Sequence, residues 1–231
     1  MGASVIIAAA GSANRMNGID KILCRINGRE ILSYSLLAFD SAECTDKIVV
    51  VTSSEKIDKI KKLVSSLSLK APFEVVCGGK TRQESVYNAL KCCDEKSDAV
   101  MIHDGARPMI TNQTITSLYN EISKNNKRGA AVGVKVKDTI KVVSEGGEIL
   151  STPDRSSLVA IQTPQCFDMD LYKKAYENAL KEGNDYTDDS QLFEAIGEKV
   201  YVLYGDYKNI KITTPDDLAY AEIFLKEREN D

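Results

Sequence analysis

Short apolar runs alternate with amphipathic stretches along most of the chain. Apolar runs predict buried strands at residues 5–10, 46–53, 73–79, 98–104 and 129–136. Apolar residues at helical spacing predict helices at residues 30–39, 55–67, 82–93 and 112–124. This alternation predicts an α/β fold with a mostly parallel, doubly wound sheet. Ligands of such sheets bind beyond the carboxyl ends of the strands, at the point where the strand order reverses.

The chain totals describe an ordinary globular protein. A chain of 231 residues suits one large α/β domain or two small ones. Because no linker, repeat or low-complexity segment divides it, we expect a single domain over residues 1–231. The net charge of −4 argues against a general affinity for nucleic acid or for anionic membranes. No apolar run reaches the length of a membrane span, and no signal-peptide pattern precedes the first strand, so we expect a cytoplasmic protein.

The cysteines and the single histidine limit the kinds of metal site and catalytic site that the chain can form. None of the six cysteines forms a C-x-x-C pair, and the adjacent Cys92 and Cys93 would make a strained disulfide. We therefore expect reduced thiols and no zinc site. The single histidine, His103, removes Ser-His-Asp triads and multi-histidine metal sites from consideration. We expect His103 to be a packed residue with a satisfied ring rather than a catalyst.

A turn of small residues follows the first predicted strand. Gly11 begins this turn, and the cations Arg15 and Lys21 come after it. Backbone N–H groups in such a turn can approach a polyphosphate closely, and cations can meet the charge that develops when a phosphoryl bond breaks. The spacing fits neither a P-loop nor a dinucleotide fingerprint. Taken alone, the turn suits a nucleotide site and an ordinary strand–helix connection equally well.

Two further strand ends carry unusual residues. Gly79 ends one strand, and Arg82 and Ser85 open the following helix, where free N–H groups attract anions or base edges. A glycine turn with a solvated arginine is the alternative. Asp104 ends another strand and suits Mg²⁺, whereas an ion pair with Arg107 that holds the turn is the other interpretation.

The pattern changes after residue 136. Residues 137–152 alternate apolar and polar side chains around a Glu-Gly-Gly-Glu turn, which predicts a projecting antiparallel hairpin that packs against a second copy of the chain. Helices are predicted at 168–182 and 188–196, a strand at 199–205, and a last helix from Thr214. Residues 209–213 also alternate like a strand, and residues 162–167 suit a pocket wall or a simple loop.

These signals together resemble one family. The segments AAAGSANRM with Lys21, GGKTRQESV, HDGARP, KDTIK, DRSSL, QTPQCF, TDD and NIKIT occur in this order from about residue 4 to residue 225. In this combination the chain resembles the 2-C-methyl-D-erythritol 4-phosphate cytidylyltransferases. The resemblance implies a Rossmann-like fold of the nucleotide-diphospho-sugar transferase type. It also implies CMP transfer from CTP to methylerythritol phosphate with release of pyrophosphate, a divalent metal such as Mg²⁺, and a homodimer joined through an arm at residues 137–157.

The resemblance carries roles to matched positions on the nucleotide side. It implies that the pair stabilising the transition state at the CTP α-phosphate is Arg15 and Lys21. The matched backbone cradle around the nucleotide is Ala9, Ala10 and Gly11. The matched contacts to cytosine and ribose are Gly79, Arg82 and Ser85. The matched metal ligand is Asp104, with Arg107 beside it.

Roles on the acceptor side come from the same resemblance. The cations matched to methylerythritol phosphate positioning are Arg155 and Lys211. Further matched substrate contacts are Thr139, Thr163 and Thr187. Because Thr139 and Arg155 lie on the predicted arm, the resemblance implies that they reach the partner's active site.

Departures from the family pattern leave rival functions open. Asp20 and Ile22 flank Lys21 where the family commonly has proline and glutamine, and Lys208 stands where an acidic residue often sits. One rival is a cytidylyltransferase for another polyol phosphate, such as ribitol 5-phosphate. A rival of another class is a nucleotide-binding module without catalysis, although simple binding does not need both Arg15 and Lys21.

Overall fold

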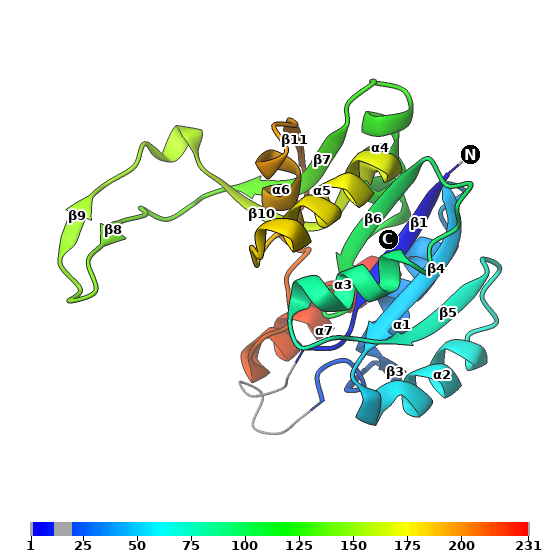
Figure 1. Ribbon diagram of the computed structural model, residues 1–231. Helices are drawn as coiled ribbons and strands as arrows, with labels where there is room; N and C mark the ends of the chain where they lie inside the picture. Colours follow the sequence, from blue (N-terminus) through cyan, green and yellow to red (C-terminus); the bar gives the residue numbers. More distant parts are fainter. Residues whose placement is uncertain (1, 12–19, 231) are drawn as a thin grey trace.

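The computed structural model describes residues 2–11 and 20–230, apart from the side chains of residues 229 and 230. Its main element is a seven-stranded sheet with the strand order β11-β7-β10-β6-β1-β4-β5 (Figure 1). The strands are β1 (Ala3–Ala8), β4 (Thr45–Thr52), β5 (Phe73–Cys77), β6 (Ala99–Asp104), β7 (Gly129–Lys135), β10 (Val159–Asp168) and β11 (Val200–Tyr204). Neighbouring strands are parallel except β10, which is antiparallel to both β6 and β7. The predicted mostly parallel α/β sheet is confirmed.

Helices cover both faces of this sheet. They are α1 (Ile31–Asp40), α2 (Ile57–Ser66), α3 (Arg82–Leu90), α4 (Asn112–Ser123), α5 (Met169–Glu182), α6 (Asp189–Ala195) and α7 (Pro215–Asn230), with short 3₁₀ turns η1 (Ser54–Lys56) and η2 (Arg155–Ser157). Residues of α1, α2 and α4 pack with Val5 and Ile7 in one buried cluster. Residues of α3, α5 and α6 pack with Ile6 in another. Since alternate residues of β1 enter opposite clusters, the sheet is doubly wound, as the sequence predicts.

The strand order reverses at β1, which lies between β6 and β4. Ala8, the last residue of β1, is opposite Val51 of β4 and Asp104 of β6. The carboxyl ends of these strands therefore meet at one edge of the sheet, and the segments that follow them converge there. This is the edge at which ligands of doubly wound sheets bind.

The predicted hairpin is present and projects from the body of the molecule (Figure 1). Its strands, β8 (Val142–Val143) and β9 (Ile149–Ser151), pair antiparallel. Apolar side chains along it are exposed: Val143 is 54% exposed, and Ile149 and Leu150 are each 60% exposed. A hairpin with such a surface has too little apolar contact of its own to be stable alone.

Some local predictions were wrong. Residues 209–213 form no strand; their backbone instead closes onto the turn after β6, where Ile212 N–H donates to the carbonyl of Ala106 at 2.9 Å. Residues 162–167 belong to the long strand β10, which the sequence analysis did not predict as such. A second small hairpin, β2 (Arg25–Ile26) with β3 (Arg29–Glu30), was also missed.

Candidate active site

A cleft of about 370 Å³ opens at the carboxyl ends of β1, β4 and β6. It brings together segments that are far apart in the sequence: the turn after β1, the start of α3, the end of β6 and the loop before α7. Most of the residues predicted to act on the nucleotide side line this cleft, along with one residue predicted to contact the acceptor. They are Ala10, Gly11, Lys21, Gly79, Arg82, Ser85, Asp104 and Lys211.

The Gly-Gly turn before α3 is shaped by that helix's own capping residues. Thr81 caps the helix, because its hydroxyl accepts from Glu84 N–H at 3.1 Å, and the Glu84 carboxylate accepts from Lys80 N–H at 2.6 Å. A Cβ on Gly79 would lie 2.3 Å from Glu84 Cγ, so only glycine fits there. The Ser85 hydroxyl accepts from Gly79 N–H at 3.0 Å and therefore fixes the turn.

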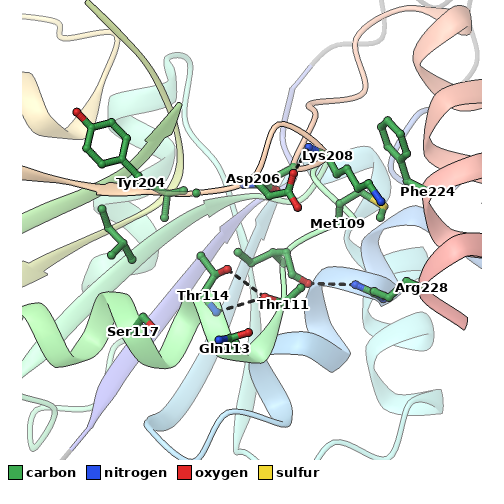
Figure 2. Close-up of a pocket in the computed structure, with 15 residues that line it drawn as sticks. Met109, Thr111, Gln113, Thr114, Ser117, Tyr204, Asp206, Lys208, Phe224 and Arg228 are labelled. Carbon is green, nitrogen blue, oxygen red and sulfur yellow. Dashed lines mark hydrogen bonds between the residues drawn. The ribbon is translucent and has the colours of Figure 1, made fainter. Parts of the chain in front are cut away.

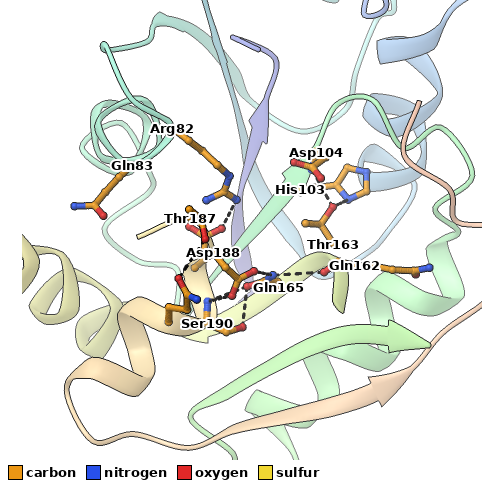
Figure 3. A network of polar contacts seen from close by, with 12 residues as sticks. Arg82, Gln83, His103, Asp104, Gln162, Thr163, Gln165, Thr187, Asp188 and Ser190 are labelled. Carbon is orange, nitrogen blue, oxygen red and sulfur yellow. Dashed lines mark hydrogen bonds and ion pairs between the residues drawn. The ribbon is translucent and has the colours of Figure 1, made fainter. Parts of the chain in front are cut away.

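Arg82 lines the cleft and is held there by a buried carboxylate. Its guanidinium forms an ion pair with Asp189, which is fully buried and also accepts from the Tyr172 hydroxyl at 2.7 Å. Burial would lower the pKa of Arg82, but the charge of Asp189 raises it above its usual value. This network from α5 and α6 continues through Asp188, Gln165 and Ser190 on the same side (Figure 3). The arginine is therefore held as a fixed cation.

Asp104 lies at the centre of the opposite wall. Its carboxylate forms ion pairs with Lys211 Nζ at 3.0 Å and with Arg107 Nε at 3.3 Å. Burial would raise the pKa of Asp104, but Lys211 and Arg107 lower it to about 2. The group is therefore a carboxylate at neutral pH. The sequence allowed either a carboxylate at a strand end or a structural ion pair with Arg107, and Asp104 is both.

His103 is packed, as predicted. It is fully buried, its Nδ1 lies 3.2 Å from Thr163 Oγ1, and its Nε2 lies 3.2 Å from the carbonyl of Arg107 (Figure 3). Both ring nitrogens thus have partners. Thr163 also accepts from Asp104 N–H at 3.0 Å, so this pair supports the strand end behind the cleft.

His103 predicts a pH-dependent stability. Burial lowers its pKa from 6.5 to about 4, so the unfolded chain takes up the proton first as the pH falls. The free energy of unfolding should therefore rise by about 3 kcal/mol between pH 4 and pH 6.5 and reach its full value above that window. Urea denaturation across pH 4.5–7.5 measures this rise.

A histidine-free variant provides the control for that slope. His103 is the only histidine, and ordinary carboxylates titrate at lower pH. His103→Gln should be less stable at every pH, but its stability should be nearly flat from pH 5.5 to pH 6.5. An unchanged slope in this variant would rule out His103 as its source.

The remaining predicted residues within the described part of the chain fall in four places. Ala9 lies directly before the cleft, where its N–H donates to the carbonyl of Val51 at 2.8 Å. Arg107 and Thr163 lie behind Asp104, and Thr187 is exposed, with its hydroxyl on Gln191 at 3.3 Å. Thr139 and Arg155 lie on the arm and do not line the cleft of their own chain. Arg15 lies outside the described residues.

Two findings were not predicted. Asp20, whose position beside Lys21 departs from the family pattern, forms an ion pair with Lys56 Nζ at 3.1 Å. Asp189, which the sequence analysis included only within the TDD segment and the helix predicted at 188–196, forms an ion pair with Arg82. Lys80 and Thr81 also line the cleft.

A doubly wound sheet that places cations and a strand-end carboxylate at its switch point suits an enzyme that binds a nucleotide. The sequence model of the family "2-C-methyl-D-erythritol 4-phosphate cytidylyltransferase" matches residues 3–227. The chain belongs to this family, and the recognition of a cytidylyltransferase is confirmed.

Individual relatives agree with the family match. The protein named 2-C-methyl-D-erythritol 4-phosphate cytidylyltransferase from Caldanaerobacter subterraneus subsp. tengcongensis is 47% identical over 228 residues, which cover 98% of this chain and 100% of that one. The crystal structure of 4-diphosphocytidyl-2C-methyl-D-erythritol synthase from Anaerococcus prevotii matches with a TM-score of 0.85 and 34% identity, covering 97% of this chain and 98% of that one. The cytidylyltransferase structure from Francisella tularensis matches with a TM-score of 0.81 and 31% identity, covering 97% and 100%.

A search for membrane-spanning helices gave none within residues 2–11 and 20–230. The same residues hold no group of three or more His, Cys, Asp and Glu side chains arranged for a metal ion. A Mg²⁺ site built from one carboxylate and substrate oxygens would not need such a group.

Proposed function

We propose that this chain transfers CMP from CTP to 2-C-methyl-D-erythritol 4-phosphate and releases pyrophosphate. An acceptor phosphate oxygen attacks the α-phosphorus, the bond from that phosphorus to the bridging oxygen breaks, and the pyrophosphate leaves with the electron pair. The observation that carries the proposal is the cleft itself, where Lys21, Arg82, Asp104 and Lys211 surround one space at the switch point of the sheet. The family match supplies the substrates.

The nucleotide side of the cleft suits a triphosphate and a base. The small residues Ala9, Ala10 and Gly11 leave the backbone open to phosphate oxygens, and the turn at Gly79 leads into α3, whose Arg82 lines the cleft. We assign Lys21 and Arg15 to the charge that builds on the α-phosphate during transfer. Ser85 acts by holding the turn, through its bond to Gly79 N–H.

The reaction needs no general base. A phosphate monoester is already anionic near neutral pH, so its oxygen can attack directly. The barrier lies in bringing two anions together and in the charge that develops on the phosphoryl oxygens. Cations therefore lower most of this barrier. The single histidine is not needed as a base, and both nitrogens of its buried ring already have partners within the chain.

Asp104 fits a divalent cation. It is an ionised hard oxygen ligand at the cleft wall, and Mg²⁺ commonly takes one or two carboxylates together with substrate phosphates and water. When bound, such an ion would neutralise phosphate charge. We assign Lys211, whose Nζ lies 3.0 Å from the Asp104 carboxylate, to the acceptor phosphate. Arg107 and Thr163 hold Asp104 in place from behind.

We further propose a homodimer joined through the 137–157 arm of a single domain. The exposed apolar side chains of the arm support this, because a second copy would cover them. Free thiols at Cys24, Cys44, Cys77, Cys92, Cys93 and Cys166 suit a reducing compartment, and we place the reaction in the cytoplasm.

The dimer proposal predicts the effect of charges on the arm. Val143→Asp with Leu150→Asp should give a monomer at micromolar concentration, because each new carboxylate would be buried in the interface. Light scattering after gel filtration measures the mass. Leu180→Asp is the matched control, since Leu180 is 52% exposed on α5, away from the arm, and should leave the dimer intact. A dimeric arm variant would contradict the proposal.

Arg155 and Thr139 are proposed to act in the partner's active site. Within its own chain, Arg155 donates to the carbonyl of Lys137 at 2.8 Å, and the arm points away from the body (Figure 1). Mixing and re-annealing Lys21→Ala and Arg155→Ala dimers should then restore activity. In the mixed dimer, one site receives an intact Lys21 and an intact Arg155, so about a quarter of wild-type activity should return. No recovery, with mixed dimers present by mass, would place Arg155 in its own chain's site.

One assay separates this function from its rivals. Pyrophosphate release is measured with CTP, Mg²⁺ and either methylerythritol phosphate or ribitol 5-phosphate. Faster turnover with ribitol 5-phosphate would favour the other polyol phosphate enzyme, and CTP binding without release would favour a non-catalytic module.

A further inference from the structure

A second cavity, of about 450 Å³, lies on the other side of the loop that carries Lys211. It is enclosed by the start of α4, the end of β11 with the loop that follows it, and the outer half of α7 (Figure 2). Among the described residues, none lines both this cavity and the cleft of the proposed reaction. It is therefore a separate space that the proposed reaction does not use.

The cavity is apolar at its base and polar along one wall. Buried Val132 and Ile110 and half-buried Leu203 form part of the base, and Phe224 of α7 faces it. The hydroxyls of Thr111, Thr114 and Ser117 lie along α4 on the opposite side (Figure 2). A small organic molecule with an apolar body fits this combination, since apolar lining with a few polar groups is typical of ligand sites.

One end of the cavity favours negative charge. The Arg228 guanidinium donates to the carbonyl of Ile110 at 3.3 Å, beside the first turn of α4. In that turn Thr114 N–H donates to the capping Thr111 Oγ1 at 3.3 Å, whereas the N–H groups of Asn112 and Gln113 have no partners within the helix. Among the described residues Arg228 has no carboxylate partner. The other rim charges are already engaged: Lys208 Nζ pairs with Glu227 at 2.8 Å, and the Asp206 carboxylate accepts from Lys208 N–H at 2.8 Å.

Asn209 has an unsatisfied buried atom beside the cavity. It lines the cavity and is 4% exposed, and its Nδ2 donates to Gln162 Oε1 and to the carbonyl of Thr163, both at 3.0 Å. Its Oδ1 is buried and finds no hydrogen-bond partner within the described part of the chain. A buried acceptor without a donor is costly, so the loop at Asn209 is held in this arrangement at a cost in free energy.

We infer that this cavity is a second binding site, for a small organic anion with an apolar body such as an aryl-alkyl carboxylate. The acidic group lies at the Arg228 end, against the first turn of α4, and the apolar body lies over Val132 and Leu203. The site lies outside the reacting groups, so its ligand is an effector rather than a substrate.

The loop from Gly205 to Lys211 connects this site to the reaction cleft. Asn209 lines the cavity, whereas Lys211, two residues on, lines the cleft and pairs with Asp104. The carbonyl of Asn209 also accepts from Arg107 Nη1 at 2.9 Å, and Arg107 pairs with Asp104. Occupancy of the cavity therefore changes the acceptor side of the cleft first. This step, unlike the binding site itself, rests on the proposed function.

The binding test uses 3-phenylpropionate, with the neutral 3-phenylpropanol as its matched control. For a ligand of this size, calorimetry or NMR titration of the full chain should give a Kd on the order of 1 mM for the acid and about tenfold weaker binding for the alcohol. Arg228→Gln should weaken binding of the acid about tenfold and leave binding of the alcohol unchanged. Arg128→Gln, a surface arginine paired with Asp168, should change neither.

A second variant fills the cavity instead of removing its charge. Ser117→Trp should abolish binding of both compounds, because Ser117 lines this cavity and lies on the outer part of α4. Its fold is checked by circular dichroism and by its response to CTP. Equal affinity for acid and alcohol, or unchanged binding of the acid to folded Ser117→Trp, would overturn the site.

The coupling is tested separately. Saturating 3-phenylpropionate should change the KM for methylerythritol phosphate by about fivefold or more while leaving the KM for CTP nearly constant, and Ser117→Trp should remove this effect. An unchanged acceptor KM at saturation would overturn the coupling. Specific binding by a chain that transfers no CMP would instead overturn the proposed function and leave the binding site standing.

Discussion

Lys21→Ala is expected to lower turnover by ~10²–10³ while the protein remains folded, because one preorganised transition-state donor contributes on that order. Lys21 lines the cleft together with Gly11 and Arg82. The charge that it meets is larger in the transition state than in bound CTP, so kcat should fall much more than the KM for CTP rises. Arg15→Ala is expected to behave in the same way.

The measurement is pyrophosphate release at saturating CTP, methylerythritol phosphate and Mg²⁺, with thermal unfolding to check the fold. Lys59→Ala provides the control, since Lys59 is an exposed lysine on α2 and its loss removes the same charge from the surface. Lys21→Arg should recover part of the turnover, because it restores a cation with different geometry. Near-normal release by Lys21→Ala would contradict the assignment of this residue to catalysis.

Local patterns were enough to predict most of the sheet and its helices. The helix from residue 30 and the strands that end at Ala8 and Asp104 are determined by apolar periodicity within a few residues of the predicted limits. Strand β10 escaped prediction because it contains Pro164 and pairs antiparallel with strands that precede it by many residues. Residues 209–213 alternate like a strand, but their backbone lies against the turn after β6, where Ile212 N–H donates to the carbonyl of Ala106, rather than along an edge of the sheet.

The site shows a sharper division between local and distant information. The capping of α3 by Thr81 and the turn at Gly79 are local and were visible as a glycine turn opening a helix. The pairs that fix the charges are not local. Arg82 and Asp189 are 107 residues apart in the chain, and no spacing rule in a single sequence joins them. The resemblance identified several of these residues, but only the three-dimensional structure shows which of them form ion pairs with one another.

The difference between local and distant information matters most at Asp104, because this predicted metal ligand also forms ion pairs with two cations. It holds Lys211 at 3.0 Å and Arg107 at 3.3 Å. Asp104→Asn is expected to lower pyrophosphate release by at least ~10²-fold, since it would remove the proposed metal ligand and free the cations that we propose to bind the acceptor phosphate. Added Mg²⁺ should not restore the rate. Because it leaves Arg107 largely buried without its charge partner, this variant should also lose about 3 kcal/mol of stability at neutral pH.

The pH dependence of that stability separates the two roles of Asp104. Its pKa is lowered from 3.8 to about 2, so its ionised form stabilises the wild type above pH 4, and this contribution is lost as the pH falls toward 2. The stability of Asp104→Asn should therefore approach that of the wild type in this acidic range. Asp98→Asn is the control at the opposite end of the same strand, where Asp98 accepts from the Tyr119 hydroxyl at 3.0 Å. It should cost stability but keep turnover, so an equal loss of turnover in both variants would show that unfolding, rather than the chemistry of Asp104, explains the result.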